Sequence, residues 1–229
     1  MLKAIEKLFI WILHIINWKK IELLFVCSVI MNNQKLSRAP NFLGYLLPAN
    51  LTVLAMIGIF GAFTCVITMV IAFPIPATNG FINIGDAVVM ITGLIFGPII
   101  GGIAGGIGSS LADLFLGYAI YAPATLVIKG LEGFLVGLIA NPKKNYKWNY
   151  RDYIGVIVGG FTMVIGYFLY EVMIFGVPSA LYEFILNSII QFGLGSVIAL
   201  IFIFAARRNI KSSLPQVFEK IYLSLDLID

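Results

Sequence analysis

Residues 84–140 read IGDAVVMITGLIFGPIIGGIAGGIGSSLADLFLGYAIYAPATLVIKGLEGFLVGLIA, and this stretch decides the fold. Its charged side chains are few, and its apolar residues form three blocks, at 84–97, 98–117 and 121–140. An apolar block of about 20 residues crosses the roughly 30 Å hydrocarbon layer of a membrane as a helix. Pro98 fits the first turn of a new helix, because proline suits that position and disfavours helix in the residue before it. We therefore expect three consecutive membrane-spanning helices, of which the first is short.

The rest of the chain extends this pattern. Of the 229 residues, 60% are hydrophobic and only 11% are charged, which is too little polar surface to cover a soluble protein of this size. Three further apolar blocks, at 50–73, 153–175 and 180–206, bring the expected number of spans to six. The sequence therefore predicts an all-α, multi-pass protein of the cell membrane, built as a bundle of six transmembrane helices.

Lys and Arg mark one side of this bundle. They precede the first span, fill the connection between the fourth and fifth spans and follow the last span, at Lys35, Arg38, Lys143, Lys144, Lys147, Arg151, Arg207, Arg208 and Lys211. The connections at 74–83, 118–120 and 176–179 contain no Lys or Arg. The positive-inside rule then places both termini in the cytoplasm and these three connections outside. Because the charges serve topology, the net charge of +4 predicts no nucleic-acid partner.

Composition divides the chain into three parts. Residues 46–210 form the six-helix membrane domain, and residues 211–229 form a cytoplasmic C-terminal tail. Residues 1–45 form an N-terminal extension, in which Trp18 and Lys19 interrupt the apolar sequence. We expect an amphipathic hairpin at the membrane surface in this extension. The alternative is that translation starts at Met31, so that the upstream residues are absent.

The sequence offers no metal or nucleotide site. Its single histidine, His14, and its two cysteines, Cys27 and Cys65, are too few for a metal-ligand set, and we predict no cofactor. A glycine-rich run lacks the Lys and Ser/Thr that follow the glycines of a phosphate-binding loop. Its four-residue repeat favours a central helix that packs closely against its neighbours, through Gly101, Gly102, Gly105, Gly106 and Gly108.

Ionisable residues within the spans are candidates for a functional site, because a charge at membrane depth is costly unless it faces a cavity or a partner. They are Asp86, Asp113, Lys129, Glu132, Glu171 and Glu183. The predicted topology brings polar groups from five helices to the outer side. Glu183, Asn187 and Gln191 follow each other at four-residue spacing, so one face of the last span is polar and should line a cavity. The predicted ligand contacts are Asn83, Asp113, Tyr121, Thr125, Lys129, Tyr167, Glu171, Asn187 and Gln191.

Structural roles compete with ligand binding for several of these charges. Asp86 follows a glycine at the start of a span, where a carboxylate is often a helix cap. Lys129 and Asp113 could form a buried ion pair that joins the third and fourth spans. Glu132 lies three residues beyond Lys129 and could neutralise it.

Motifs in the densest part of the chain, residues 82–140, resemble a known family. They are Asn83-Ile-Gly-Asp86-Ala, Phe96-Gly-Pro98, Gly105-Gly-Ile-Gly-Ser-Ser-Leu-Ala-Asp113, Gly117-Tyr118, Tyr121-Ala-Pro-Ala-Thr125 and Lys129-Gly130. In order and spacing the chain resembles, over residues 50–206, the S-component of energy-coupling factor (ECF) vitamin transporters. It is most similar to the riboflavin-type subgroup of these substrate-binding membrane subunits.

The resemblance implies a subunit that captures a vitamin or vitamin precursor of the riboflavin, pyridoxine or pyrimidine type from outside. Such a subunit associates with a transmembrane coupling protein and two ATPase subunits. The resemblance also implies that small residues of the first span, Ala55, Gly58 and Ala62, contact the coupling protein. The residues alone leave open whether this patch docks a partner or packs internally. Metal-carrying members use histidines near the N-terminus, and this chain has none in a matching position.

Two other classes of function could use the same intramembrane polar residues or nearby serines. A stand-alone secondary transporter or channel could use Asp113, Lys129 and Glu171 as a proton relay. An intramembrane protease could use Ser109 or Ser110, but no general base other than Lys129 is evident at membrane depth. The sequence therefore predicts a binding subunit that is not an enzyme.

Overall fold

The computed structural model describes residues 41–76, 78–143 and 149–222. The chain divides into two compact units, Met1–Ala39 and Pro40–Asp229, and every described residue belongs to the second. The expected interfacial hairpin of the N-terminal extension lies outside the described residues. The domain boundaries at residues 45 and 210 stay predictions.

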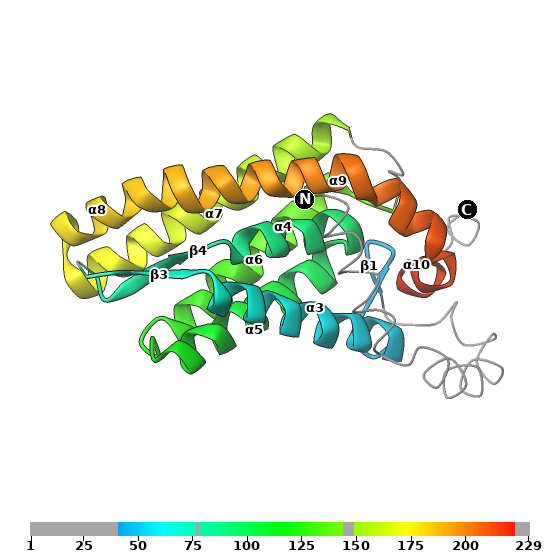
Figure 1. Ribbon diagram of the computed structural model, residues 1–229. Helices are drawn as coiled ribbons and strands as arrows, with labels where there is room; N and C mark the ends of the chain where they lie inside the picture. Colours follow the sequence, from blue (N-terminus) through cyan, green and yellow to red (C-terminus); the bar gives the residue numbers. More distant parts are fainter. Residues whose placement is uncertain (1–40, 77, 144–148, 223–229) are drawn as a thin grey trace. The chain divides into compact units, whose positions relative to one another are not determined.

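The second unit is a bundle of membrane-length helices (Figure 1). Its main helices are α3 (Leu51–Val70), α4 (Gly85–Phe96), α5 (Pro98–Leu116), α6 (Ala122–Ala140), α7 (Tyr150–Phe175) and the continuous run of α8 (Val177–Leu186), η2 (Asn187–Phe192) and α9 (Gly193–Ser213). Five helices of the described residues are long and apolar enough to cross a membrane, and α4 is a shorter apolar helix. The predicted all-α polytopic fold is confirmed, with the last span extended at both ends.

Local sequence explains where the helices begin and end. Pro98 opens α5 directly after Gly97, whose φ of 88° breaks the chain direction after α4. Gly117, at φ 87°, ends α5 in the left-handed conformation. Asn149 and Asp152 form a capping box at the start of α7, in which each side chain bonds the other residue's backbone N–H.

A buried strand precedes the short apolar helix α4. The connection predicted at 74–83 forms a hairpin of β3 (Ala72–Ile75) and β4 (Gly80–Asn83), which pair antiparallel. The 12 residues of α4 rise about 18 Å, and the four residues of β4 add about 13 Å in front of them. All of β4 is buried, which is the condition under which non-helical backbone is tolerated at membrane depth. This strand was not expected, because residues 74–83 were predicted as a connection.

The glycine-rich run packs α5 against its neighbours, as its spacing predicted. Helix α5 contacts α3, α4 and α6. A Cβ atom added at Gly106 would lie 2.6 Å from the Leu126 carbonyl oxygen, and one at Gly101 would lie 2.8 Å from that of Gly133. The α5 and α6 backbones therefore touch directly, and neither position has room for a side chain.

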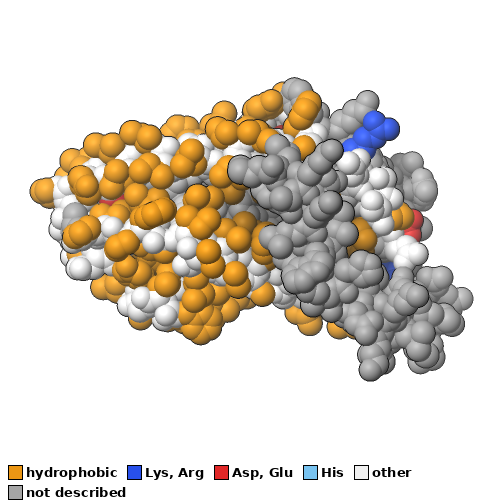
Figure 2. Space-filling model, viewed as in Figure 1, with side chains coloured by type: hydrophobic (Ala, Val, Ile, Leu, Met, Phe, Trp, Pro, Cys, Tyr) orange, Lys and Arg blue, Asp and Glu red, His pale blue; other side chains and the backbone are white. Residues whose placement is uncertain are grey.

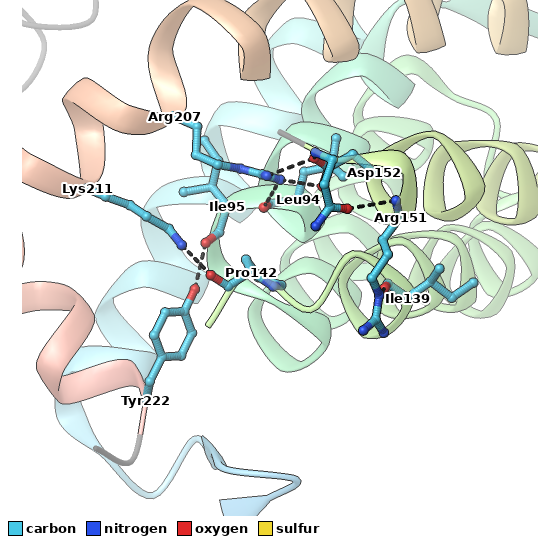
Figure 3. Close-up of polar contacts among 10 residues, drawn as sticks. Leu94, Ile95, Ile139, Pro142, Arg151, Asp152, Arg207, Lys211 and Tyr222 are labelled. Carbon is cyan, nitrogen blue, oxygen red and sulfur yellow. Dashed lines mark hydrogen bonds and ion pairs between the residues drawn. The ribbon is translucent and has the colours of Figure 1, made fainter. Parts of the chain in front are cut away.

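Arg207 joins three helices at one end of the bundle. From α9 it donates to both carboxylate oxygens of Asp152 on α7, at 2.9 and 2.8 Å (Figure 3). It also donates to the Leu94 carbonyl at 2.8 Å, near the end of α4, where helical carbonyls have no partner within the helix. Both charged side chains are buried, so this pair fixes α4, α7 and α9 relative to one another.

Two short strands and a final helix cover the same end. The strands β1 (Asn41–Phe42) and β2 (Tyr45–Leu46) form a tight hairpin, and α10 (Pro215–Ile221) packs against α3, α9 and β2. Tyr45 donates to the Asn141 side chain at 3.0 Å, and burial raises the pKa of its phenol, which keeps the donor protonated. Tyr222 donates to the Ile95 carbonyl at 2.6 Å, and Lys211 to that of Pro142 (Figure 3).

Charge is distributed unevenly between the two ends of the bundle. Within the described residues, every Lys and Arg except Lys129 belongs to the end where α6 and α9 finish and α7 begins. In the view of Figure 2, hydrophobic side chains cover most of the described surface, and Lys and Arg appear at one end only. The hairpin β3–β4, the α5–α6 connection and the start of α8 lie at the opposite end (Figure 1).

Candidate ligand-binding site

A small pocket with a cavity volume of about 20 Å³ lies at the end of the bundle that is poor in Lys and Arg. Six segments contribute to its wall, namely β4, α5, the residue before α6, α6 itself, α7 and the α8–η2 run. The lining residues are Phe81, Asn83, Asp113, Tyr121, Thr125, Tyr167, Glu183, Asn187 and Gln191. This set combines carboxylates, amides and hydroxyls with aromatic rings, as pockets for small organic ligands do.

Most of the residues predicted as ligand contacts converge on this pocket. Asn83, Asp113, Tyr121, Thr125, Tyr167, Asn187 and Gln191 line it, whereas Lys129 and Glu171 are buried outside its lining. Two further lining residues, Phe81 and Glu183, are not among the predicted ligand contacts. Glu183 begins the polar stripe of the last span, so its spacing was a signal for it. Phe81 lies on the unpredicted strand and gave no signal.

Lys129 is held by two carboxylates, of which Glu132 was expected and Asp86 was not. Its ammonium group bonds the Asp86 carboxylate and lies 3.3 Å from Oε2 of Glu132. The alternative of a Lys129–Asp113 pair is wrong, because α4 packs against α6 and brings Asp86 to the lysine instead. The expected neutralisation by Glu132 is confirmed.

Asp86 is therefore an ion-pair partner and makes no capping hydrogen bond. No side-chain hydrogen bond caps α4 at its first position. Oδ1 of Asn83 instead accepts the N–H of Gly85, the first residue of α4, at 2.8 Å, which satisfies one of the free donors at the helix start. The carboxylate of Asp86 nevertheless lies in the first turn of α4, where a negative charge complements the helix dipole.

The hairpin is attached to the pocket wall by three hydrogen bonds. The Thr78 hydroxyl donates to Glu183, and the Tyr121 hydroxyl donates to the Thr78 carbonyl at 3.1 Å. The Asn83 N–H donates to Oε1 of Gln191 at 3.3 Å. These bonds connect β4 and its turn to α8, η2 and the start of α6, so the hairpin forms one side of the pocket.

A π-helical segment presents the amides of the last span. Asn187 and Gln191 both lie in η2 and are both 3% exposed. A π-turn holds more residues than an α-turn and is frequent at functional sites. The predicted stripe of polar residues thus reaches one pocket, although through a helix geometry that the spacing did not predict.

Aromatic side chains and a hydroxyl pair form the wall towards α7. The Tyr167 and Thr125 hydroxyls share a hydrogen bond of 2.9 Å between α7 and α6. The ring centroids of Tyr121 and Tyr167 are 6.5 Å apart, and the Tyr121 ring stacks on Phe175 at 6.1 Å. Rings placed at these distances stabilise one another and offer flat surfaces to a planar ligand.

Buried acceptors without a partner also lie at the pocket. Oδ2 of Asp113 and Oδ1 of Asn187 have no hydrogen-bond partner, although each residue is only 3% exposed. A buried unsatisfied acceptor destabilises the protein by about 1–3 kcal/mol. Among the residues that the structure describes, no group of three or more His, Cys, Asp or Glu side chains is placed to hold a metal ion.

The patch predicted for partner docking lies on the surface of α3. Ala55, Gly58 and Ala62 are exposed, and a Cβ atom added at Gly58 would meet nothing within 4 Å. Gly61 instead faces the α5 backbone, with 3.6 Å between its added Cβ and the Ala104 carbonyl oxygen. Within the described residues, the patch is not used for internal packing.

Comparisons with known proteins agree with this architecture. Residues 49–208 match the family model of the ECF-type riboflavin transporter, S component. An uncharacterized protein in a gap 3′ region of Pyrococcus woesei is 43% identical over 133 residues, which cover 58% of this chain and 86% of the relative. The thiamine precursor transporter HmpT of Lactococcus lactis subsp. cremoris (strain MG1363) is 30% identical over 151 residues, covering 66% of this chain and 84% of HmpT. The chain therefore belongs to the family of ECF-type riboflavin transporter S components, which are multi-pass membrane transport proteins and not enzymes.

Proposed function

We propose that the protein is the substrate-binding subunit of an ATP-driven importer and captures a vitamin or vitamin precursor from outside. The observation that carries the proposal is the pocket, because five separate segments of the chain (β4, α5, α6 with the residue before it, α7 and the α8–η2 run) converge there with polar and aromatic groups. Its position at the end opposite most Lys and Arg supports an outward-facing site, since positive residues favour the cytoplasmic side.

The proposal specifies the ligand as a class of compound and not as one vitamin. Riboflavin-, pyridoxine- and pyrimidine-type compounds are the candidate classes. The name of the Lactococcus relative, a thiamine precursor transporter, supports a thiamine precursor over riboflavin.

The energy for transport would come from partner chains. We expect a transmembrane coupling protein and two ATPase subunits to associate with this subunit in the bilayer. The exposed Ala55, Gly58 and Ala62 support a docking face on α3, because small residues let a neighbouring helix approach closely.

A ligand screen on purified protein tests the proposal. We expect native mass spectrometry and calorimetry to find one B vitamin or precursor that binds in the micromolar range or tighter, equivalent to about 8 kcal/mol or more. Gln191→Leu should weaken this binding, because Gln191 lines the pocket, whereas Glu219→Gln on the exposed face of α10 should not. A folded protein that binds nothing in the panel would refute the proposal, and proton-driven uptake by the protein alone in liposomes would favour a secondary transporter instead.

A further inference from the structure

Two buried carboxyl groups from different helices meet beside the pocket. Glu171 lies near the end of α7 and Glu183 lies in α8, and these two helices pack against each other (Figure 1). The two carboxyl groups are within hydrogen-bonding range of each other. Glu171 is 0% exposed and lies outside the pocket lining, whereas Glu183 is 3% exposed and belongs to the lining. Glu171 therefore reaches the pocket through Glu183.

The contact between the two carboxyl groups needs a proton. Neither Oε1 nor Oε2 of Glu171 has a hydrogen-bond donor among the described residues. Two ionised carboxylates have no hydrogen atom to share, and they repel each other because a buried site screens charge weakly. One proton on the pair removes this repulsion and forms a charge-assisted O–H···O hydrogen bond. The contact is therefore bonding only in the protonated pair.

No cation faces the pair from the described part of the neighbouring elements. The side chains that interact with it are Thr78 of the hairpin turn, Tyr121 before α6, Tyr167 of α7 and Asn187 of η2. From α5, Asp113 lines the same pocket as Glu183 and adds a further carboxyl group.

The surrounding interior is also short of positive charge. Lys129 is the one described Lys or Arg that lies outside the Lys- and Arg-rich end, and it already bonds Asp86 and pairs with Glu132. Five buried carboxyl groups thus share one ammonium group in this part of the bundle, namely Asp86, Asp113, Glu132, Glu171 and Glu183. Because an unpaired buried charge is costly, protons must neutralise part of this set.

The carboxyl pair also holds the β3–β4 hairpin. The Thr78 hydroxyl donates to Oε2 of Glu183, and the Tyr121 hydroxyl donates to the Thr78 carbonyl at 3.1 Å. Strand β4 covers the other oxygen, because a Cβ atom added at Gly80 would lie 3.2 Å from Oε1 of Glu183. Repulsion from Glu171 would move Glu183 out of these contacts and detach the hairpin turn from α8. The pocket wall therefore depends on the charge of the pair.

We infer that Glu171 and Glu183 form a proton-binding site, and that the single proton they share fixes the wall of the pocket. Glu171 is a positioning residue, which holds Glu183 against Thr78 and does not touch the ligand. Release of the proton at high pH separates the two side chains and loosens the wall. The inference goes beyond the proposed function, because the pair binds its proton whether or not the ligand is a vitamin.

Infrared spectroscopy on the full-length protein in an ester-free detergent detects this proton. A protonated carboxyl group has a C=O stretching band at a frequency where neither a carboxylate nor an amide absorbs. At neutral pH we expect Glu171→Gln to lose the intensity of one carboxyl group, because the amide donates to Glu183 and replaces the proton. Glu171→Gln combined with Glu183→Gln should lose no more, since the pair holds one proton. An undiminished band in the single variant, or the loss of two carboxyl groups in the double variant, would overturn the inference.

The pH dependence of thermal stability provides a second test. Glutamates of the unfolded chain have released their protons by about pH 6, whereas the folded pair still holds one, so stability falls as the pH rises further. We expect the melting temperature of the unchanged protein to fall by several degrees between about pH 6 and about pH 9, and the profile of Glu171→Gln to be flatter. Glu219→Gln on the exposed face of α10 should keep the original profile. Equal slopes in Glu171→Gln and the unchanged protein would contradict the shared proton.

A consequence for ligand capture rests on the proposed function. Over the same pH range, the affinity for the ligand found by screening should fall at least tenfold in the unchanged protein and much less in Glu171→Gln. Equal pH profiles of affinity in the two proteins would overturn the role of the proton in the pocket wall. A protein that binds no vitamin or precursor would end the proposed function, and the infrared and melting experiments would still decide the inference.

Discussion

At the scale of one residue, the ion-pair partners of buried Lys129 depend on how the helices pack, which spacing along the chain does not report. Its position in a span predicted a functional or a structural role, and the sequence suggested Asp113 as its ion-pair partner but not Asp86. The two aspartates lie on different helices, and nothing in their spacing reports which helix packs closer to α6. The structure assigns the lysine to Asp86 and Glu132.

Replacing Lys129 by methionine should therefore reduce accumulation of the protein in the membrane. The change leaves Asp86 and Glu132 buried without a cation, which typically destabilises a protein by about 3–5 kcal/mol. Quantitative detection in membranes and the melting temperature in detergent measure the loss. Arg208→Met removes a cation from the exposed side of α9 and should have little effect.

A double variant separates the ion pair from other roles of Lys129. Lys129→Met combined with Asp86→Asn removes both charges of the shortest pair and should recover part of the lost stability. If Lys129→Met alone accumulates and melts like the unchanged protein, the structural role of the lysine is wrong.

The last membrane crossing shows what periodicity can predict at the scale of an element. Four-residue spacing placed Glu183, Asn187 and Gln191 on one face, and all three line the pocket. The change from α to π geometry at Asn187–Phe192 could not be predicted, because the intervening apolar residues fit either helix. The strand β4 escaped prediction for a similar reason, since Pro74, Pro76 and Gly80 are typical of an exposed loop.

Deleting Ile189 should weaken ligand binding at least tenfold. The deletion removes a residue from the π-segment and favours plain α geometry, which would rotate Gln191 relative to Asn187 by roughly 60° away from alignment. Ile189→Ala keeps the length of the segment, and its side chain is 68% exposed towards the outside of the bundle, so this variant should bind normally. Calorimetry on folded protein compares the two, and normal affinity after the deletion would show that the π-segment does not position the amides.

At the scale of the whole molecule, three features occupy different parts of the bundle. Most Lys and Arg lie at one end, the pocket lies at the other, and the exposed patch of small residues lies on the outer face of α3. The six crossings and their order could be predicted, because hydropathy and the Lys and Arg of the connections act over whole segments. The faces at which helices meet depend on packing in three dimensions. For this reason the sequence left open whether Ala55, Gly58 and Ala62 pack internally, and only the structure places them on the surface of α3.

Larger side chains in the small-residue patch of α3 should weaken assembly with the coupling protein without weakening ligand binding. Gly58→Leu combined with Ala62→Leu fills the patch, so we expect co-purification with the coupling protein to fall at least tenfold while ligand affinity stays unchanged. Ala205→Leu makes the same kind of change on the exposed side of α9 and serves as the control. Undiminished co-purification of the double variant would place the docking face elsewhere.

The close contact between α5 and α6 limits which substitutions such proteins can accumulate. The two backbones touch at positions where neither Gly106 nor Gly101 has room for a Cβ atom. A larger residue on one helix cannot be compensated by a smaller one on the other where its partner, such as Gly133, already lacks a side chain. We therefore expect evolution to hold this contact constant and to change the pocket wall around it, so that one helical frame can acquire specificity for different solutes.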